Sequence, residues 1–203
     1  MANKAKARWD KIAPFYELAT GPGPLLRWEP ARRKFFSRMS SGRILFVSAG
    51  TGLEFQYFAP AKSIVAIDLS SEMLVRARAR AEIYQGAIEL VEADLADLPF
   101  ESASFDQVFV SHTMNYLQRP EQALDAIHRV LKPGGELHLF EQSLTWIFPF
   151  VLMLSVMSLL YKPFGVSMNR RTVALVKKAG FGIEGVENIY LDVIKTVSAR
   201  KTE

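Results

Sequence analysis

Cysteine is absent from this sequence of 203 residues, and histidine occurs only three times. The lack of cysteine excludes disulfide bonds, thiolate catalysis and zinc sites with cysteine ligands. So few histidines, with no HExxH sequence, argue against a metal site built on several of them. A chain without cysteine suits a reducing compartment. The first residues, MANKAKARWDKIAPFYE, lack an apolar core and a small-residue cleavage motif, so we expect no secretory signal peptide.

The composition is otherwise that of an ordinary globular domain. Hydrophobic residues make up 49% of the chain and charged residues 23%, which supplies enough apolar surface for a core. This balance excludes a disordered chain. A length of 203 residues suits one domain with an added segment.

Positive charge is concentrated in the N-terminal fifth of the chain. Residues 1–43 contain ten Lys and Arg against three Asp and Glu, a net charge of +7, whereas the whole chain carries +4. Such a segment favours a polyanion or an anionic membrane surface. It is equally typical of a helix face that is simply solvated, and both interpretations stay open. A helix is expected over about residues 4–19, with Trp9, Ile12, Phe15 and Tyr16 on one face.

Beyond residue 43, short apolar runs alternate with amphipathic stretches. The run ILFV at 44–47 is continuous, as in a strand buried on both faces. Ser70 is a helix-capping residue, and Pro120 suits the first position of another helix. The sequence KPGG at 132–135 is expected to be a turn. The expected strands lie at residues 44–47, 63–68, 88–94, 104–111, 136–141, 183–189 and 191–199.

This alternation predicts an α/β domain. We expect a seven-stranded, mostly parallel sheet with helices on both faces and an antiparallel edge strand. In such sheets the ligand binds beyond the carboxyl ends of the strands. The turns that should line the site are 48–54, 68–73, 94–98, 111–116 and 141–146.

Three of these turns carry residues suited to a nucleotide-like ligand. Gly50 and Gly52 follow a buried strand and allow the backbone to approach a ligand closely. Asp68 closes the second strand, where an acid accepts hydrogen bonds from ribose hydroxyls. Asp94, beside Leu95, closes the third strand and is suited to an adenine ring. Each feature alone is also common as a purely structural turn, so the combination carries the interpretation.

With these residues in place, the chain resembles the class I S-adenosylmethionine-dependent methyltransferases, which have a Rossmann-like fold. The matching motifs are ILFVSAGTG (44–52), VAIDLSSEML (65–74), VEADLADLPFESASFDQVFVS (91–111) and RVLKPGGELHLFE (129–141). Within this class it is similar to the branch of quinone-biosynthesis methyltransferases and small methyltransferase-like proteins with lipophilic acceptors. The resemblance implies S-adenosyl-L-methionine as cofactor, S-adenosyl-L-homocysteine as product, and no metal.

The resemblance also implies roles for the residues that match the motifs. Those that would contact the cofactor are Ser48, Gly50, Thr51, Gly52, Asp68, Leu69, Met73, Asp94, Leu95 and Ser111. The sequence WDKIAPFYE (9–17) resembles the helical lid of the class, and its aromatic Tyr16 would close over the cofactor. The chain departs from the pattern at Phe46, where an acid is usual, and at Ser48, where the first glycine is usual. These departures concern cofactor affinity, for which Glu54 or the lid would have to compensate.

Methyl transfer from a sulfonium is an in-line displacement, so alignment and exclusion of water carry most of the catalysis. An acceptor that must lose a proton also needs a base. His112 and Glu141, at strand ends, are the candidates, and Tyr16 of the lid completes the catalytic set. A loop histidine and a structural acid are the alternative interpretations. The residues expected to orient the acceptor are Asn115, Tyr116 and Trp146.

The segment QSLTWIFPFVLMLSVMSLLY (142–161) has no charge in twenty residues. Its length alone suits a transmembrane helix, but strands of one sheet flank it and Pro149 favours a break. It is therefore an apolar lid over the acceptor, a segment lying in a membrane interface, or a helix buried in the core or in a dimer. We expect a lid and membrane-contact region at 1–40 and a cofactor-binding domain at 41–203, with 142–170 an apolar insertion on the substrate side.

The expected function is transfer of a methyl group (EC 2.1.1.-) to a lipophilic small molecule or lipid: a phospholipid headgroup amine, a quinone ring or a thiol. The alternative is a non-catalytic protein of this fold that docks on a membrane or assists assembly, as Phe46 and Ser48 suggest. A nucleic-acid substrate is not expected despite the pI of 9.3, because SHTMNY (111–116) lacks a turn that stacks on a flipped base. We expect a cytoplasmic protein that contacts the inner face of a membrane. Its oligomeric state stays open.

Overall fold

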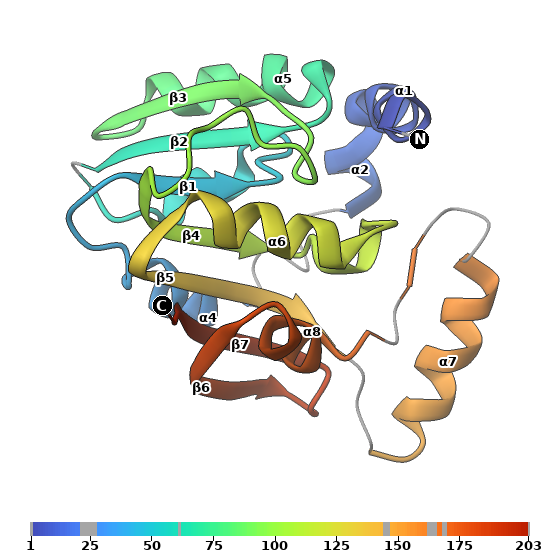
Figure 1. Cartoon of the computed structure of the whole chain (residues 1–203). Helices are drawn as coiled ribbons and strands as arrows, with labels where there is room; N and C mark the ends of the chain where they lie inside the picture. The colour runs from blue at the N-terminus through green and yellow to red at the C-terminus, as the bar shows by residue number, and fades with distance from the viewer. Residues whose placement is uncertain are drawn as a thin grey trace. The chain divides into compact units, whose positions relative to one another are not determined.

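The computed structural model describes residues 2–20, 28–60, 62–143, 147–161, 166–167 and 170–202. The chain divides into two compact units, Met1–Pro99 and Phe100–Glu203, which run from blue to green and from green to red in Figure 1. Within the described residues, none of the helices combines the length and the apolarity that a membrane crossing requires.

The first unit begins with helices and continues with three strands. The helices are α1 (Ala2–Ile12), α2 (Tyr16–Thr20), α4 (Glu29–Phe36) and α5 (Ser71–Glu82), with short 3₁₀ turns at Ala13–Phe15 and Leu53–Tyr57. The helix expected over 4–19 is divided because Pro14 stands in the first of these turns and has no N–H to continue an α-helix.

The three strands of the first unit are parallel. They are β1 (Ile44–Val47), β2 (Ser63–Asp68) and β3 (Ala87–Glu92), in the order β3-β2-β1. Ile44 pairs with Ile64 and Asp68 pairs with Glu92, so the carboxyl ends of all three strands lie at one edge. All four residues of β1 are buried, as its continuous apolar sequence predicts.

Four aromatic rings form the core around β1. Phe46 lies between Phe36 of α4, at 5.9 Å between ring centroids, and Phe58, at 5.0 Å. Phe55 completes the cluster at 6.3 Å from Phe46. Phe46 is 1% exposed. Its departure from the methyltransferase pattern therefore has a packing reason, since an acid in this cluster would be buried among apolar rings.

Within its described residues, the second unit carries four strands and three α-helices. The strands are β4 (Phe105–Ser111), β5 (Leu131–Gln142), β6 (Phe181–Tyr190) and β7 (Ile194–Lys201). The helices are α6 (Pro120–Val130), α7 (Phe150–Tyr161) and α8 (Thr172–Lys178), with a 3₁₀ turn at Met114–Tyr116. α6 packs against β5, and α8 packs against β6. Pro120 occupies the start of α6, as predicted.

Two details of these strands differ from the prediction. The sequence KPGG (132–135), predicted to be a turn before the fifth strand, lies within that strand. β5 begins at Leu131, and its pairing with β4 shifts in register across these residues. Phe105 of β4 pairs with Leu131, and Gln107 already pairs with Glu136. The antiparallel strand is β7, which pairs with both β5 and β6, so β6 forms the edge.

The seven strands follow the order β3-β2-β1-β4-β5-β7-β6. The predicted fold class, a seven-stranded and mostly parallel sheet with an antiparallel pair at its end, is confirmed.

Replacing Phe36 by alanine should destabilise the protein by about 3–5 kcal/mol, because its ring is fully buried in the aromatic cluster. Chemical denaturation followed by circular dichroism measures this loss. Phe15, which is 65% exposed, is the matched control, and Phe15→Ala should change stability by less than about 0.5 kcal/mol. Equal losses in both variants would contradict the placement of the core.

Candidate active site

The turn after β1 has the conformation that its glycines predict. Gly50 and Gly52 have φ values of 56° and 78°, in the left-handed region. A Cβ at Gly52 would lie 2.9 Å from the Phe55 ring, so a side chain is excluded there by both conformation and space. Ser48 also has a positive φ, 56°. Ser48 therefore adopts the left-handed backbone conformation for which glycine is usual, and this conformation strains a residue that has a side chain.

Asp68 ties this turn to the next one. Its Oδ2 accepts a hydrogen bond from the Gly50 backbone N–H at 2.8 Å, and its Oδ1 accepts one from the Ser70 N–H at 2.9 Å. Burial raises the pKa of the Asp68 carboxyl, and the N–H donors of Ser70, Gly50 and Leu69 oppose that rise. A carboxylate offers about four acceptor positions, and these three N–H donors leave about one for a ribose hydroxyl.

The turn after β3 is held by Asp94. Its Oδ1 accepts a hydrogen bond from the Ala96 N–H at 2.9 Å, and its carbonyl accepts one from the Asp97 N–H at 2.9 Å. Leu95 is 6% exposed and Met73 of α5 is 2% exposed. Asp94 thus orders its own loop, which is the structural alternative, and also stands at the strand end where an adenine ring is expected.

The N-terminal helix α1 is attached to the same turn as Asp68. Asp10 Oδ1 accepts a 2.6 Å hydrogen bond from the Ser70 hydroxyl, which lowers the pKa of Asp10. Ser70 is fully buried, and its Oγ in turn accepts from the Met73 N–H. Lys6 donates to Ser71 Oγ at 2.8 Å and forms an ion pair with Glu92. One buried serine therefore connects α1 to Asp68.

A second attachment joins α2 to the glycine turn. Arg80 of α5 binds both carboxylate oxygens of Glu17, at 2.9 and 3.1 Å, and donates to the Thr51 carbonyl at 2.8 Å. Burial alone would raise the pKa of Glu17, but hydrogen bonds from Arg80 and Thr51 hold it below its ordinary value. Tyr16 lies next to this pair and packs edge-on against Trp9, with 6.4 Å between ring centroids. The placement of Tyr16 over the cofactor stays a prediction.

Glu54, the residue named as a compensating acid, is bound by a cation. Arg32 donates from Nε to Glu54 Oε1 at 3.0 Å, and the two side chains are 6% and 15% exposed. The charge of Glu54 is therefore largely satisfied within the protein. The lid attachments at Asp10 and Glu17 are the stronger candidates for supporting the cofactor site.

In the second unit, Glu141 at the end of β5 holds the turn after β4. Its Oε1 accepts hydrogen bonds from the N–H groups of Thr113, at 2.7 Å, and Met114, at 3.1 Å. Glu141 is 1% exposed. This geometry favours a positioning role for Glu141. Its assignment as the base stays a prediction.

His112 and Ser111 occupy the end of β4. His112 has a positive φ of 49°, and its ring meets Phe140 edge-on at 5.1 Å between centroids. The ring is only half-buried, so a ligand can reach it. Ser111 is 8% exposed and its carbonyl accepts from the Thr113 hydroxyl. Of the two candidate bases, His112 is the more accessible, since Glu141 is almost fully buried.

Asn115 is placed between β4 and β5. The side-chain Nδ2 of Asn115 donates to the Gln142 carbonyl at 3.0 Å, and the backbone carbonyl of Asn115 accepts from the Ser167 N–H. Asn115 is 5% exposed, and within the described part of the chain its buried Oδ1 has no hydrogen-bond donor. Tyr116 is 41% exposed at the same turn. Trp146, the third residue predicted to orient the acceptor, lies outside the described residues.

Arg170 is a cation that the sequence analysis did not assign to the site. It donates from Nη2 to the Leu117 carbonyl, and its own carbonyl accepts from the Ser143 hydroxyl. Burial lowers the pKa of Arg170, and the negative charges of Glu121 and Glu141 oppose that change. The residue therefore connects the turn after β4 with the segment after β5. Its long-range partners left no local signal in the sequence.

Comparisons with known proteins agree with this arrangement. Residues 45–139 match the family described as a methyltransferase domain. The chain is 34% identical over 146 residues to a demethylmenaquinone methyltransferase of Clavibacter sepedonicus and 33% identical over 139 residues to one of Thermus thermophilus. These matches cover 69% and 66% of this chain, but only 58% and 63% of the relatives' own length.

Solved structures share the fold. The crystal structure of the cyclase SpnF superimposes with a TM-score of 0.76 and 17% identity, over 100% of this chain and 96% of that one. An S-adenosylmethionine-dependent methyltransferase from Mesorhizobium loti superimposes with a TM-score of 0.62 and 24% identity, over 85% and 97%. At these identities the likeness concerns the fold alone.

The fold and the glycine–aspartate turns define a Rossmann-like domain built for a nucleoside-containing cofactor. The motifs and the comparisons identify the family within that class. The chain belongs to the class I S-adenosylmethionine-dependent methyltransferases.

S-adenosylmethionine is the cofactor of this family, and it fits the turns of the first unit that carry Gly50, Asp68 and Asp94. A Cβ at Gly50 would meet no atom within 4 Å, so the glycine turn borders open space. Asp68, at the end of β2, would hold the ribose, and Asp94 with Leu95, in the turn after β3, would hold the adenine.

Asp68→Asn should weaken binding of S-adenosylhomocysteine at least roughly tenfold, because it removes the charged acceptor of a ribose hydroxyl hydrogen bond. Isothermal titration calorimetry measures this affinity. Asp125→Asn, at an exposed position of α6, is the matched control and should bind as the wild type does. Unchanged affinity in Asp68→Asn would overturn the ribose assignment.

The attachment of α2 should also contribute to cofactor affinity. Glu17→Gln removes the bidentate pair with Arg80, and we expect a loss of roughly threefold to tenfold in affinity for S-adenosylhomocysteine. Glu29→Gln breaks a comparable surface pair, with Arg33 on α4, and should have no effect. Equal behaviour of the two variants would show that the lid does not support the cofactor.

Proposed function

We propose that this chain transfers the methyl group of S-adenosylmethionine to a ring carbon of a lipophilic quinol. The observation that carries the proposal is the Asp68 carboxylate, hydrogen-bonded to Gly50 and Ser70 at the end of β2. The quinol is supported by the names of the relatives, which are 33–35% identical and include C-methyltransferases of ubiquinone and menaquinone biosynthesis. Headgroup amines and thiols are the less supported acceptors.

When bound, the cofactor supplies a methyl group already activated on a sulfonium. The protein then has to align the acceptor, exclude water and remove a proton from the ring. Ser70, Asp10 and Arg80 keep the cofactor turns and the lid helices in one arrangement. Alignment of this kind is the main contribution that a protein makes to such a displacement.

The second unit offers the acceptor two polar groups. Asn115 Oδ1 is a buried acceptor and would receive the hydrogen bond of a ring hydroxyl. Glu141 fixes that turn through the N–H groups of Thr113 and Met114, so Asn115 is held in place. Tyr116 and Trp146 would pack on the ring. Ser111 would lie near the sulfonium.

His112 would act as the base. Methylation at carbon removes one proton from the ring, and an imidazole accepts it near neutral pH. Glu141 is less suited to this task because its Oε1 already accepts two backbone hydrogen bonds. Tyr16 would close the site from the lid.

With a lipophilic acceptor, the protein would act in the cytoplasm at the inner face of a membrane. The N-terminal fifth, residues 1–43, carries a formal charge of +7 and supports contact with anionic headgroups. The proposed domain organisation follows: a lid at 1–40, a cofactor domain at 41–203 and an apolar segment at 142–170 on the acceptor side.

The proposal is tested by transfer of labelled methyl from S-adenosylmethionine into a quinol in detergent micelles. Wild-type protein should label the organic phase, whereas Asp94→Ala should lose most of the activity and Asp125→Asn should retain it. Binding of S-adenosylhomocysteine without transfer would redirect the search to other acceptors. Neither binding nor transfer would favour a non-catalytic protein of this fold.

A further inference from the structure

Helix α7, Phe150–Tyr161, exposes a broad apolar face. Leu152, Val156 and Leu159 follow the i, i+4, i+7 spacing of one helix face and are 58%, 50% and 71% exposed. Met153, at the border of this face, is 47% exposed. Such contiguous exposure is unusual for a soluble surface and marks a site of contact with another apolar body.

The opposite side of α7 is the one turned inward. Leu154 is 3% exposed, and Val151 is half-buried on the same side of the helix. The exposed face contains one polar side chain, Ser155, whose hydroxyl donates to the Val151 carbonyl at 2.7 Å. That hydroxyl is therefore satisfied within the helix, and the exposed face can leave water without stranding a donor.

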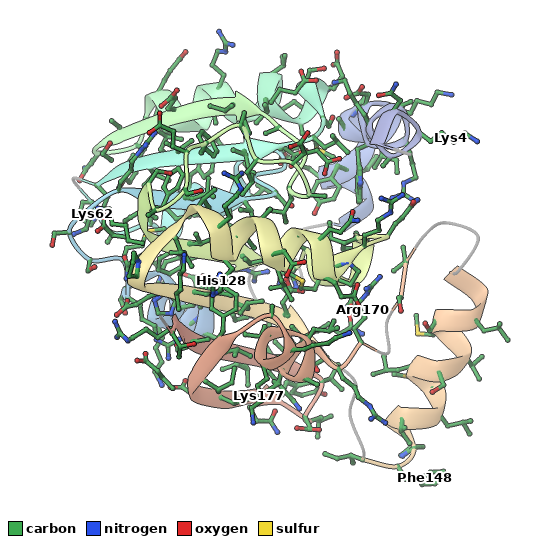
Figure 2. All side chains as sticks on the ribbon, viewed as in Figure 1. Lys4, Lys62, His128, Phe148, Arg170 and Lys177 are labelled. Atoms are coloured by element: carbon green, nitrogen blue, oxygen red, sulfur yellow. The ribbon has the colours of Figure 1, made fainter. Side chains whose placement is uncertain are left out.

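The charge of the surrounding chain is of one sign. From Gln142 to Ile183 the sequence contains five Lys and Arg and no Asp or Glu. Figure 2 labels two of these cations, Arg170 and Lys177, and also Phe148, which precedes α7 and is 76% exposed. Apolar side chains accompanied only by cations are complementary to an anionic lipid surface.

The length of α7 decides how it would meet a bilayer. Twelve residues make a helix of about 18 Å, whereas a crossing needs about 30 Å. The helix would therefore lie in the interface with its axis along the membrane plane. A second copy of this chain is the weaker alternative, because a symmetric contact would bring the two cationic segments together.

We propose that α7 inserts its exposed apolar face into the headgroup region of an anionic bilayer. The segment follows β5, which carries Glu141 at its end, so insertion would bring the acceptor side of the second unit to the lipid. The benefit for catalysis rests on the proposed function, since only a membrane-dissolved acceptor gains from it. The binding itself requires neither cofactor nor acceptor.

The test is sedimentation of the full chain with vesicles of phosphatidylcholine, with and without phosphatidylglycerol. Wild-type protein should bind the anionic vesicles, and added salt should weaken the binding. The double variant Leu152→Glu and Val156→Glu should lower the partition coefficient roughly tenfold or more. The matched control is Val75→Glu with Ile83→Glu, at two exposed apolar positions in the first unit, and it should bind as the wild type does.

Circular dichroism and titration with S-adenosylhomocysteine establish that each variant is folded. If the glutamate variant fails to fold, Leu152→Ser with Val156→Ser replaces it. Equal binding by wild type and α7 variant, or no binding to either vesicle, overturns the inference. So does a wild-type dimer that the α7 variant converts to a monomer without a change in vesicle binding.

The outcomes for the inference and for the proposed function are separable. Vesicle binding that depends on α7, without methyl transfer to a quinol, supports the inference and contradicts the proposed acceptor. Methyl transfer in detergent micelles, without vesicle binding, supports the acceptor and overturns the inference.

Discussion

The cofactor site depends on one carboxylate. Asp68 accepts hydrogen bonds from Gly50 and Ser70, and so it joins the turns that follow β1 and β2. Neither turn is held by regular secondary structure at this point, because the strands have ended and their N–H groups need other acceptors. Burial raises the pKa of Asp68, and the N–H donors that oppose this rise also organise the site. The same charge is the one on which ribose binding would depend.

The lid helices extend this constraint. Ser70 donates its N–H to Asp68 and its hydroxyl to Asp10, so α1 is coupled to Asp68 through a single buried residue. Arg80 does the same for α2, because it holds Glu17 and the Thr51 carbonyl together. Phe46, by contrast, belongs to the aromatic core. Position 46 therefore offers no acid to support the cofactor, and we expect Asp10 and Glu17 of the N-terminal helices to give that support instead.

Local pattern was sufficient for the strands and for the turns at their ends. The continuous apolar residues of ILFV predicted a buried strand, and Gly50 with Gly52 predicted a turn with left-handed backbone conformation. It was insufficient for KPGG, where the ladder with β4 continues past a bulge. The roles of Glu17 and Arg80 were also missed, since the two residues are separated by 63 positions and only the fold brings them together.

The sequence by itself determined the class of fold, the family and the chemical identity of the turn residues. These depend on short-range periodicity and on residue types that few other backbones tolerate. Tertiary structure decided which partner each charged side chain finds. Asp10 binds Ser70, Arg32 binds Glu54, and Glu141 binds two backbone N–H groups. Tertiary structure also decided which face of α7 is exposed, since a helix without charged side chains has no strongly polar face that would reveal its orientation. Long-range contacts leave no local pattern, so only the folded chain reveals them.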